Sequence, residues 1–346
     1  MGLIIHAPNV HLGGGRTLLM ALLKAAAYSG QCLAVVDARM KISTSLTQNV
    51  LIQRVRAGFI DRLKAEWNLR RRTTEKDTVL CLGNLPPLFK IKAKAFVFVQ
   101  NRYLVEKTSL KGFRAVVRLR IMLERRWLAW RAVTADGFIV QTATMQRIMN
   151  KNMGIIPDVI PFSEATKNYS RSAAGTAVSS SKKYDFLYIA SGEPHKNHRR
   201  LIEAWCMLAE EGIYPSLCIT VQKVSVPDLC EWIEQVTKTF ALRIENIQDV
   251  NYTDASRLYV EAGALIYPSM LESMGLPLIE ARCACLPILA SEMDYVRDVI
   301  DPEQSFAPDS AISIARAVKR HLGIKEKPLP LRDAEGFLKC IMSKSG

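Results

Sequence analysis

The chain has 346 residues, of which 49% are hydrophobic and 23% charged, a composition typical of soluble globular proteins and long enough for two domains. Its net charge of +14 is uneven, because residues 1–160 carry 26 Lys and Arg against 9 Asp and Glu, whereas residues 161–346 carry 21 against 24. The sequence disfavours a transmembrane protein, because the longest apolar run, residues 18–28, is too short to cross a membrane. It disfavours an exported protein, because no export signal is evident. It also disfavours a zinc-binding or disulfide-rich protein, because the eight cysteines form no C-x-x-C pair.

Short apolar runs alternate with longer helical patterns along the chain, as in βαβ units whose strands form parallel sheets. We therefore predict an α/β fold with two Rossmann-like, doubly wound parallel-sheet domains. Because ligands bind beyond the carboxyl ends of parallel strands, the two domains should face each other across a central cleft. The expected strands are residues 3–7, 32–37, 78–83, 95–100, 137–141, 155–160, 184–190, 216–221, 244–247, 264–267 and 287–290.

The domain boundary is expected in a segment that is rich in Ser, Thr, Ala and Gly and has few large apolar residues. On this basis residues 1–162 form the first domain, residues 163–183 a linker or mobile loop, and residues 184–346 the second domain. The last helix is expected to stay with the second domain or to pack back on the first.

Three consecutive glycines follow the first strand. Gly13, Gly14 and Gly15 precede a helix that is expected to begin near Thr17. Glycines let the backbone approach a ligand, and the N-terminus of a helix favours an anion. The spacing does not match the dinucleotide motif G-x-G-x-x-G, so the residues alone indicate either an anion site or a structural turn.

The densest basic segment is residues 102–131, where cations alternate with apolar side chains that include Trp127 and Trp130. A basic amphipathic helix of this kind suits an anionic membrane surface, with the aromatic rings at the level of the headgroups. The alternative is an ordinary domain helix with a solvated basic face. Nucleic acid is disfavoured as a partner, because the chain carries no recognisable nucleic-acid-binding motif.

In the second half, a strand is expected to end at Ser191 and Gly192. The turn that follows holds His195, Lys196 and His198 and opens a helix. Lys196 is placed where it could meet a phosphate, although a lysine exposed at a helix start is an equally ordinary reading.

The stretch LESMGLPLIEA, residues 271–281, lies between an expected strand and an expected helix that begins near Leu276. Pro277 fits the first turn of that helix, where its missing N–H costs nothing. Glu272 then lies in the preceding loop and Glu280 about one turn inside the helix. The backbone N–H groups at the helix start could hold a diphosphate, with the two carboxylates holding hydroxyls beside it; alternatively, Glu272 is a simple cap.

Taken together, EPHKNHRRLIEAW and YPSMLESMGLPLIEARCACLPILAS resemble the retaining glycosyltransferases of family 4, which have the GT-B fold and include enzymes of bacterial lipopolysaccharide, O-antigen and exopolysaccharide synthesis. Their signature is a glutamate pair E-x7-E, which Glu272 and Glu280 match. The resemblance covers residues 184–320 well and the first half loosely, through the glycine turn and the segment 138–149.

The resemblance implies a role for each matching residue. Glu272 contacts the transferred sugar and, with Lys196, supports catalysis, whereas Glu280 binds the ribose. Many relatives carry arginine where this chain has His195, which leaves less fixed positive charge near the diphosphate. The donor site implied in this way comprises Gly14, Gly15, Gly192, His195, Lys196, Ser273, Met274, Gly275, Leu276 and Glu280, and the acceptor side Gly13, Asn84, Asn101 and Arg102.

The implied reaction is transfer of a sugar from a nucleotide diphosphate sugar, with UDP or GDP as the favoured nucleotides, to a hydroxyl of a lipid-linked or lipopolysaccharide-type saccharide. It retains the anomeric configuration and needs no metal or other cofactor. We expect the protein in the cytoplasm, peripherally bound at the inner face of the membrane. The alternatives are a non-catalytic nucleotide-sugar-binding or scaffold protein and another GT-B enzyme such as an epimerase.

Overall fold

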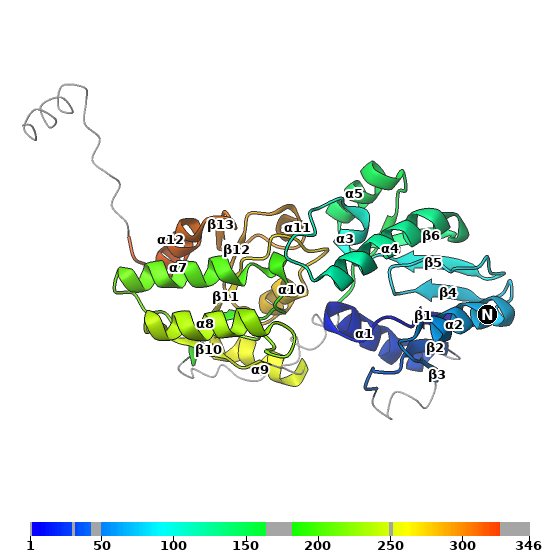
Figure 1. Cartoon of the computed structure of the whole chain (residues 1–346), viewed down its shortest axis with the longest axis horizontal. Coiled ribbons are helices and arrows are strands. Elements are labelled where there is room, and N and C mark those ends of the chain that lie inside the picture. Colours follow the sequence, from blue (N-terminus) through cyan, green and yellow to red (C-terminus); the bar gives the residue numbers. More distant parts are fainter. Residues whose placement is uncertain (1, 30–31, 43–49, 164–181, 249–251, 326–346) are drawn as a thin grey trace, which may run out of the picture.

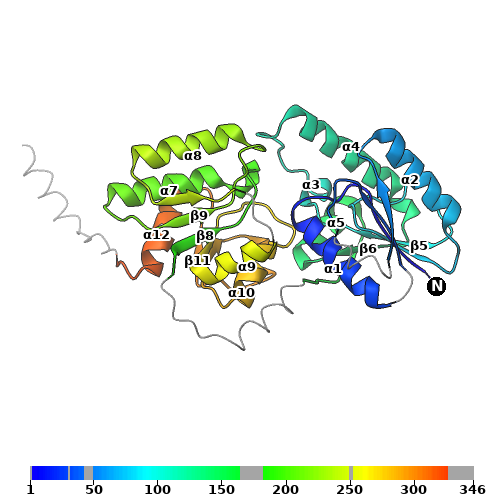
Figure 2. The same ribbon diagram turned by 90° about the horizontal axis from the view of Figure 1, so that it is seen from below.

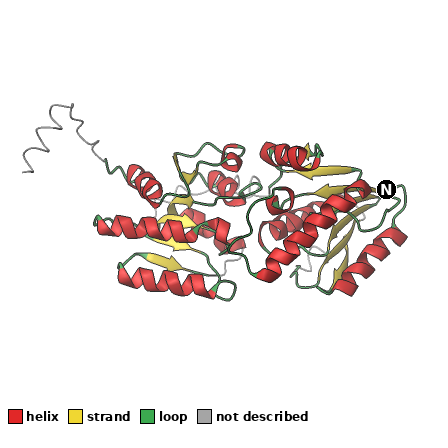
Figure 3. Ribbon diagram, turned by 45° about the horizontal axis from the view of Figure 1, so that its top comes forward, coloured by secondary structure: helices red, strands yellow, loops and turns green. Residues whose placement is uncertain are grey.

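The computed structural model describes residues 2–29, 32–42, 50–163, 182–248 and 252–325. They form two α/β bodies that lie end to end along the long axis of the molecule (Figure 1). Helices lie on both sides of the strands in each body (Figure 3). The α/β fold with two parallel sheets is as predicted from the sequence.

The first body contains a seven-stranded sheet in the order β3-β2-β1-β4-β5-β6-β7, and every neighbouring pair is parallel. The order reverses between β1 and β4, which is where ligands bind in doubly wound sheets. Its strands are β1 (Leu3–Ala7), β2 (Cys32–Asp37), β3 (Val50–Val55), β4 (Thr78–Cys81), β5 (Lys94–Phe98), β6 (Gly137–Val140) and β7 (Asp158–Val159). Its helices are α1 (Gly13–Ser29), α2 (Phe59–Arg72), α3 (Arg102–Val105), α4 (Ala115–Arg131) and α5 (Ala143–Met153).

The second body contains a six-stranded parallel sheet in the order β10-β9-β8-β11-β12-β13, with its reversal between β8 and β11. Trp205 and Tyr188 are fully buried in its core. Its strands are β8 (Tyr184–Tyr188), β9 (Leu217–Ile219), β10 (Ile244–Asn246), β11 (Ala262–Tyr267), β12 (Ile288–Ser291) and β13 (Gln304–Phe306). Its helices are α7 (His198–Glu210), α8 (Pro227–Thr239), α9 (Tyr252–Glu261), α10 (Leu276–Cys283), α11 (Asp294–Arg297) and α12 (Ala311–His321).

Every predicted strand overlaps an observed one, and two observed strands were not predicted. β3 was missed because its sequence VLIQRV mixes polar with apolar residues, as is common at the edge of a sheet, and β13 because it has only three residues. The seven cysteines among the described residues form no disulfide with one another.

Two local predictions were wrong. The first helix begins at Gly13 and not near Thr17, because the N–H groups of a first turn have no intrahelical partner and the entropic cost of glycine is smallest there. The basic segment 102–131 is not one helix but α3 and α4, separated by a loop in which Gly112 has a φ of +87°.

The two bodies meet through loops that follow strands at their carboxyl ends. Thr142, after β6, donates its hydroxyl to the carbonyl of Ser273 at 3.0 Å, and Arg102, after β5, pairs with Asp294 at 2.9 Å. The predicted sites at these strand ends are therefore brought together between the two sheets. The expected linker lies almost wholly outside the described residues, as do residues 326–346, so the domain boundaries and the packing of the last helix stay predictions.

Candidate donor site between the two sheets

Glu272 lies in the loop after β11 and is held by three donors. Its Oε1 accepts hydrogen bonds from Lys196 Nζ at 2.6 Å, Ser269 Oγ at 2.8 Å and Tyr267 Oη at 2.9 Å. Burial alone would raise the pKa of this carboxyl, but the charge and hydrogen bond of Lys196, with the bond from Ser269, outweigh it and lower the pKa. Glu272 is therefore an anion near neutral pH, and its Oε2 has no partner among the described residues.

Lys196 is presented by a short 3₁₀ turn, Pro194–Lys196, that follows β8. Asn197 adopts a left-handed conformation after it, with a φ of +63°, and donates to the carbonyl of Pro268 at 3.1 Å. The carbonyl of His195 accepts from the N–H of Met270 at 2.8 Å. The loops after β8 and β11 are thus fastened to each other, which fixes Lys196 beside Glu272.

His195 lies between aromatic rings of the first body. Its ring centroid is 5.4 Å from that of Tyr103, edge to face, and 6.3 Å from that of Phe113, nearly stacked. Burial and the charge of Lys196 lower the pKa of His195 against the opposing carboxylates of Glu272 and Glu193. The ring is accordingly neutral near pH 7, so the positive charge of this turn comes from Lys196.

His198, which the sequence suggested as a further polar member of this turn, is a core residue. Its ring packs against Tyr188 at 4.8 Å, and burial, together with the charge of Lys196, lowers its pKa to about 3. A cationic role for His198 is therefore excluded by its surroundings.

The start of α10 offers backbone donors beside Glu272. Gly275 precedes the helix with a φ of +72°, and Pro277 occupies its first turn as predicted. The N–H groups of Met274, Gly275 and Leu276 have no acceptor among the described residues. Free N–H groups at the positive end of a helix are the donors that the anion site expected from the sequence would need.

Glu280 lies one turn inside α10 and differs from Glu272 in its surroundings. It accepts a hydrogen bond from Tyr259 Oη at 2.8 Å. Burial raises the pKa of Glu280, and the bond from the neutral phenol offsets only part of that rise. The arrangement leaves carboxylate oxygens that could accept from a pair of hydroxyls.

The glycine turn of the first body faces the start of α10. A Cβ added at Gly14 would lie 3.2 Å from Leu276 Cδ1, and one at Gly15 would lie 3.5 Å from Gln100 Oε1. Gly13 has a φ of +61° and open space around its missing Cβ. Gly192 differs, because a Cβ there would lie 2.2 Å from Val226 Cγ2, so close packing within the second body accounts for this glycine.

The polar side chains predicted for the acceptor side bind within the chain, and Arg102 does so across the interface between the two bodies. Asn84 Oδ1 accepts from the N–H groups of Gln100 and Asn101, and the Asn101 side chain accepts from Tyr103 N–H at the start of α3. Arg102 is 7% exposed and binds both oxygens of Asp294, at 2.9 and 3.0 Å, and also Glu106.

Sequence reasoning missed several groups that complete the site. These are the hydroxyls of Tyr267, Ser269 and Tyr259, the Thr142 hydroxyl and the Asp294 carboxylate. Tyr267 and Ser269 stand at the end of β11, a position that could have marked them. The other three are distant in sequence from the groups they bind, and no local pattern reveals such pairs.

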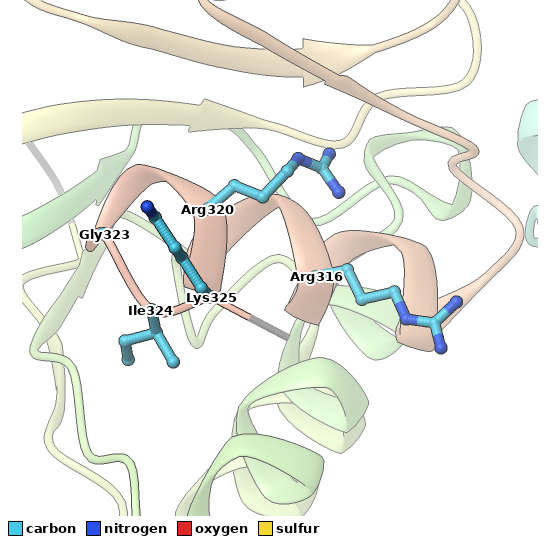
Figure 4. A pocket seen from close by; sticks show the side chains of 5 residues that line it. All are labelled: Arg316, Arg320, Gly323, Ile324 and Lys325. Atoms are coloured by element: carbon cyan, nitrogen blue, oxygen red, sulfur yellow. The ribbon is translucent and has the colours of Figure 1, made fainter. Parts of the chain in front are cut away.

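A separate hollow of about 430 Å³ lies at the end of α12 and in the turn after it (Figure 4). None of the predicted site residues lines it; its residues are Arg316, Arg320, Gly323, Ile324 and Lys325.

Within the described ranges, no group of three or more His, Cys, Asp or Glu residues is arranged to hold a metal ion. No helix in the described part of the chain has the length and hydropathy to cross a membrane.

Comparisons with known proteins relate this chain to glycosyl transferases in sequence. The family model described as Glycosyl transferases group 1 matches residues 175–334. The chain is 26% identical over 205 residues to the serotype-specific mannosyltransferase WbdA of Escherichia coli, covering 58% of this chain and 24% of WbdA. It is 30% identical over 116 residues to the O-antigen chain mannosyltransferase B of E. coli, covering 33% and 30%. It therefore spans only about a quarter to a third of these relatives.

Among solved structures, that of Anabaena Alr3699/HepE in complex with UDP and glucose has a TM-score of 0.65 at 15% identity, covering 93% of this chain and 90% of that one. A structure described as trehalose-6-phosphate from E. coli bound with UDP-2-fluoro glucose has a TM-score of 0.68 at 10% identity, covering 94% and 92%. At these identities the likeness concerns the fold. The chain thus has the GT-B fold, and its residues 175–334 are similar to the glycosyl transferases of group 1.

Proposed function

We propose that the protein is a glycosyltransferase that moves a sugar from a nucleotide diphosphate sugar to a hydroxyl of a lipid-linked or lipopolysaccharide-type saccharide. The observation that carries this proposal is the Lys196–Glu272 pair, 2.6 Å apart, beside the free N–H groups at the start of α10. The group 1 family match over the same residues supports it, as do the O-antigen mannosyltransferases among the relatives.

The proposed chemistry depends on stabilising the departing diphosphate. Negative charge grows on it as the glycosidic bond weakens, and the N-terminus of α10 with Lys196 offers fixed positive potential there. Glu272 accepts three hydrogen bonds on one oxygen and has a lowered pKa, which makes it a weak base. We assign it to orienting the sugar, and Glu280 to the ribose hydroxyls.

We further propose that the configuration is retained and that no metal takes part. In retaining enzymes of this type, as the sequence resemblance implies, the acceptor attacks from the side of the leaving group, and a donor phosphate oxygen takes its proton. Neither glutamate is then needed as a nucleophile. The anomeric configuration of the product, determined by NMR, tests the first point; an unchanged rate in EDTA supports the second.

The test of the function is release of nucleoside diphosphate from candidate donors, with and without a lipid-linked saccharide. GDP-mannose is the first choice, because the curated relatives are named mannosyltransferases, and UDP-glucose the second, because structural neighbours are described with UDP and glucose. We expect Lys196→Met and Glu272→Gln to lower kcat by 10²- to 10³-fold. Lys223→Met is the matched control, because Lys223 pairs with Glu234 on the surface.

The alternatives give different results in the same assay. Conversion of the donor into another nucleotide sugar, without an acceptor and without net release of nucleoside diphosphate, would favour another GT-B enzyme such as an epimerase. Binding of a nucleotide sugar without any turnover would favour a non-catalytic protein. Equal rates for the wild type and Glu272→Gln would overturn the proposed site.

We also propose that the basic first body binds the inner face of the membrane, where a lipid-linked acceptor would be presented. In α4 and the turn after it, five apolar side chains are exposed at spacings of three, four and seven residues, so they share one side of the helix: Val116, Leu119, Leu123, Trp130 and Val133. Ile121 and Leu128, on the opposite side, are buried in the core. Arginines flank the exposed row, an arrangement typical of helices that lie on anionic lipid. Flotation with anionic vesicles at low salt tests this, and absence of binding would contradict it.

A further inference from the structure

Helix α2 exposes a second row of apolar side chains that the sequence analysis did not single out. Phe59, Leu63 and Trp67 follow one another at four-residue spacing and are 82%, 39% and 46% exposed. Ala65 and Leu69 face the core instead. Single exposed apolar residues are ordinary on a protein surface, whereas a contiguous row of them indicates an interaction surface on this face of α2.

The row borders a hollow on the surface. The hollow measures about 400 Å³ and is lined by Leu63, Lys64, Trp67, Asn68 and Phe89. Trp67 and Phe89 meet edge to face, with ring centroids 5.5 Å apart. The walls are thus largely apolar and aromatic, and two rigid rings hold them in shape.

Cations surround this apolar hollow. The guanidinium of Arg70 lies 5.5 Å from the ring centroid of Trp67 and 6.0 Å from that of Phe89. Lys64 lines the hollow, and Arg71 and Arg72 follow in the last turn of α2. An occupant that fits both features has an apolar chain for the walls and a negative group for the rim.

Helix α2, which lines the hollow, lies next to α4. The two helices cover the same side of the first sheet next to each other (Figure 2), and Leu69 of α2 shares a core cluster with Ile121 and Leu128 of α4. Both helices are rich in arginine, so a second copy of this chain docked here would bring like charges together. An anionic lipid surface is complementary to both helices at once.

We propose that the hollow lined by Trp67 and Phe89 binds the hydrocarbon chain of an anionic lipid, whose headgroup contacts Lys64 and Arg70. Helix α2 then fixes the first body on the membrane at a defined point, while α4 lies along the surface. This inference rests on the proposed membrane association and adds a specific lipid site to it. It makes no use of the residues assigned to sugar transfer.

The experiment measures tryptophan emission from the full chain mixed with vesicles whose phospholipid chains carry bromine, which quenches nearby rings. With vesicles of phosphatidylglycerol and phosphatidylcholine we expect quenching of the wild type, and a smaller quenched fraction in Trp67→Phe. Trp130→Phe reports on α4 in the same way. Pure phosphatidylcholine vesicles are expected to quench little, because the cations then have no anionic partner.

Vesicle flotation supplies the matching affinities. Arg70→Gln should bind phosphatidylglycerol vesicles about five-fold more weakly, the ratio for ~1 kcal/mol per cation near an anionic surface. Leu63→Asn should weaken binding as well. Ile312→Gln is the control, because Ile312 is an exposed apolar residue on α12 of the other body. Thermal unfolding and nucleoside diphosphate release establish that each variant is folded and that its donor site is intact.

Several results would overturn the proposal. The lipid site is excluded if quenching of Trp67→Phe equals that of the wild type, or if only Trp130→Phe loses quenching. Equal quenching by pure phosphatidylcholine would exclude the anionic headgroup. Concentration-dependent dimers that Leu63→Asn abolishes, without vesicle binding, would assign the hollow to a second copy. In each case unchanged donor turnover would leave the proposed transferase function standing.

Discussion

Replacing Lys196 by methionine keeps the bulk of the side chain but removes the cation that holds Glu272. The two side chains are only 15% and 14% exposed, so most of the glutamate charge would be left buried without its counterion. Breaking a fully buried pair in this way costs 3–5 kcal/mol. Here Tyr267 and Ser269 still donate to the carboxylate, so we expect the lower end, about 3 kcal/mol, or roughly 6–12 °C in Tm.

The pH dependence of stability should change sign in this variant. In the wild type the pKa of Glu272 is below that of the unfolded chain, so its contribution is present above the unfolded pKa and is lost as the pH falls through the folded pKa. In Lys196→Met, Glu272 keeps only its two hydroxyl donors, which are too weak to offset burial. The pKa of Glu272 should therefore rise above its value in the unfolded chain. Stability then decreases as the pH rises through that raised pKa.

Urea unfolding of the two proteins between pH 5 and 8 measures this effect. We expect the loss caused by Lys196→Met to be largest at pH 8 and clearly smaller at pH 5. Adding Glu272→Gln removes the buried charge, so the double variant should recover part of the stability at pH 8 and lose the inverted slope. Lys223→Met, in an exposed pair, should change stability by no more than ~0.5 kcal/mol. A Lys196→Met variant as stable as the wild type at pH 8 would refute the reasoning.

Three further changes test other parts of the structure. Gly192→Ala places a Cβ 2.2 Å from Val226 and should destabilise the protein by about 1–3 kcal/mol, with Val226→Ala restoring most of it; urea unfolding showing no loss would contradict the packing explanation. Gly275→Ala forces a side chain into a φ of +72° and should cost about 1–2 kcal/mol while weakening nucleotide binding in calorimetry; unchanged affinity would count against the anion site. Because the pKa of His198 is about 3 in the folded protein and about 6.5 in the unfolded chain, the free energy of unfolding should fall as the pH drops below 6.5, by about 1.4 kcal/mol at pH 5.5. Urea unfolding of His198→Phe should show a smaller fall with pH, and an equal fall would exclude His198 as its cause.

The strands were predictable because parallel strands buried on both faces appear in the sequence as continuous apolar runs. β1, β2 and β11 are of this kind, and each overlaps its predicted range closely. β3, at the edge of its sheet, has exposed polar positions and lacks that signature. The start of α1 was misplaced because glycine has low propensity inside a helix but is tolerated in the first turn.

The candidate site was predictable only in part, because its key contacts join residues far apart in the chain. Lys196 and Glu272 are separated by 76 residues, and only the family resemblance suggested that they lie together. Arg102 and Asp294 are separated by 192 residues and were not paired at all. His195 and His198 belong to one turn in the sequence, yet one lies between aromatic rings at the interface and the other in the core.

Glu272 and Glu280 show how the surroundings give one residue type opposite pKa shifts within one motif. Burial pushes the pKa of both carboxyls upward, and only Glu272 has a cation close enough to reverse the shift. As an anion bound to Lys196, Glu272 can orient a sugar without taking the acceptor proton. The hydrogen bonds that its carboxylate already accepts lower its pKa and make it a weak base. Glu280 accepts a hydrogen bond from the neutral Tyr259, and the proposed function assigns its carboxylate to two vicinal hydroxyls of the ribose. The E-x7-E spacing places the two carboxylates on either side of the same helix start, and the contacts around them make Glu272 a charged partner of Lys196 and Glu280 an acceptor for the phenol of Tyr259.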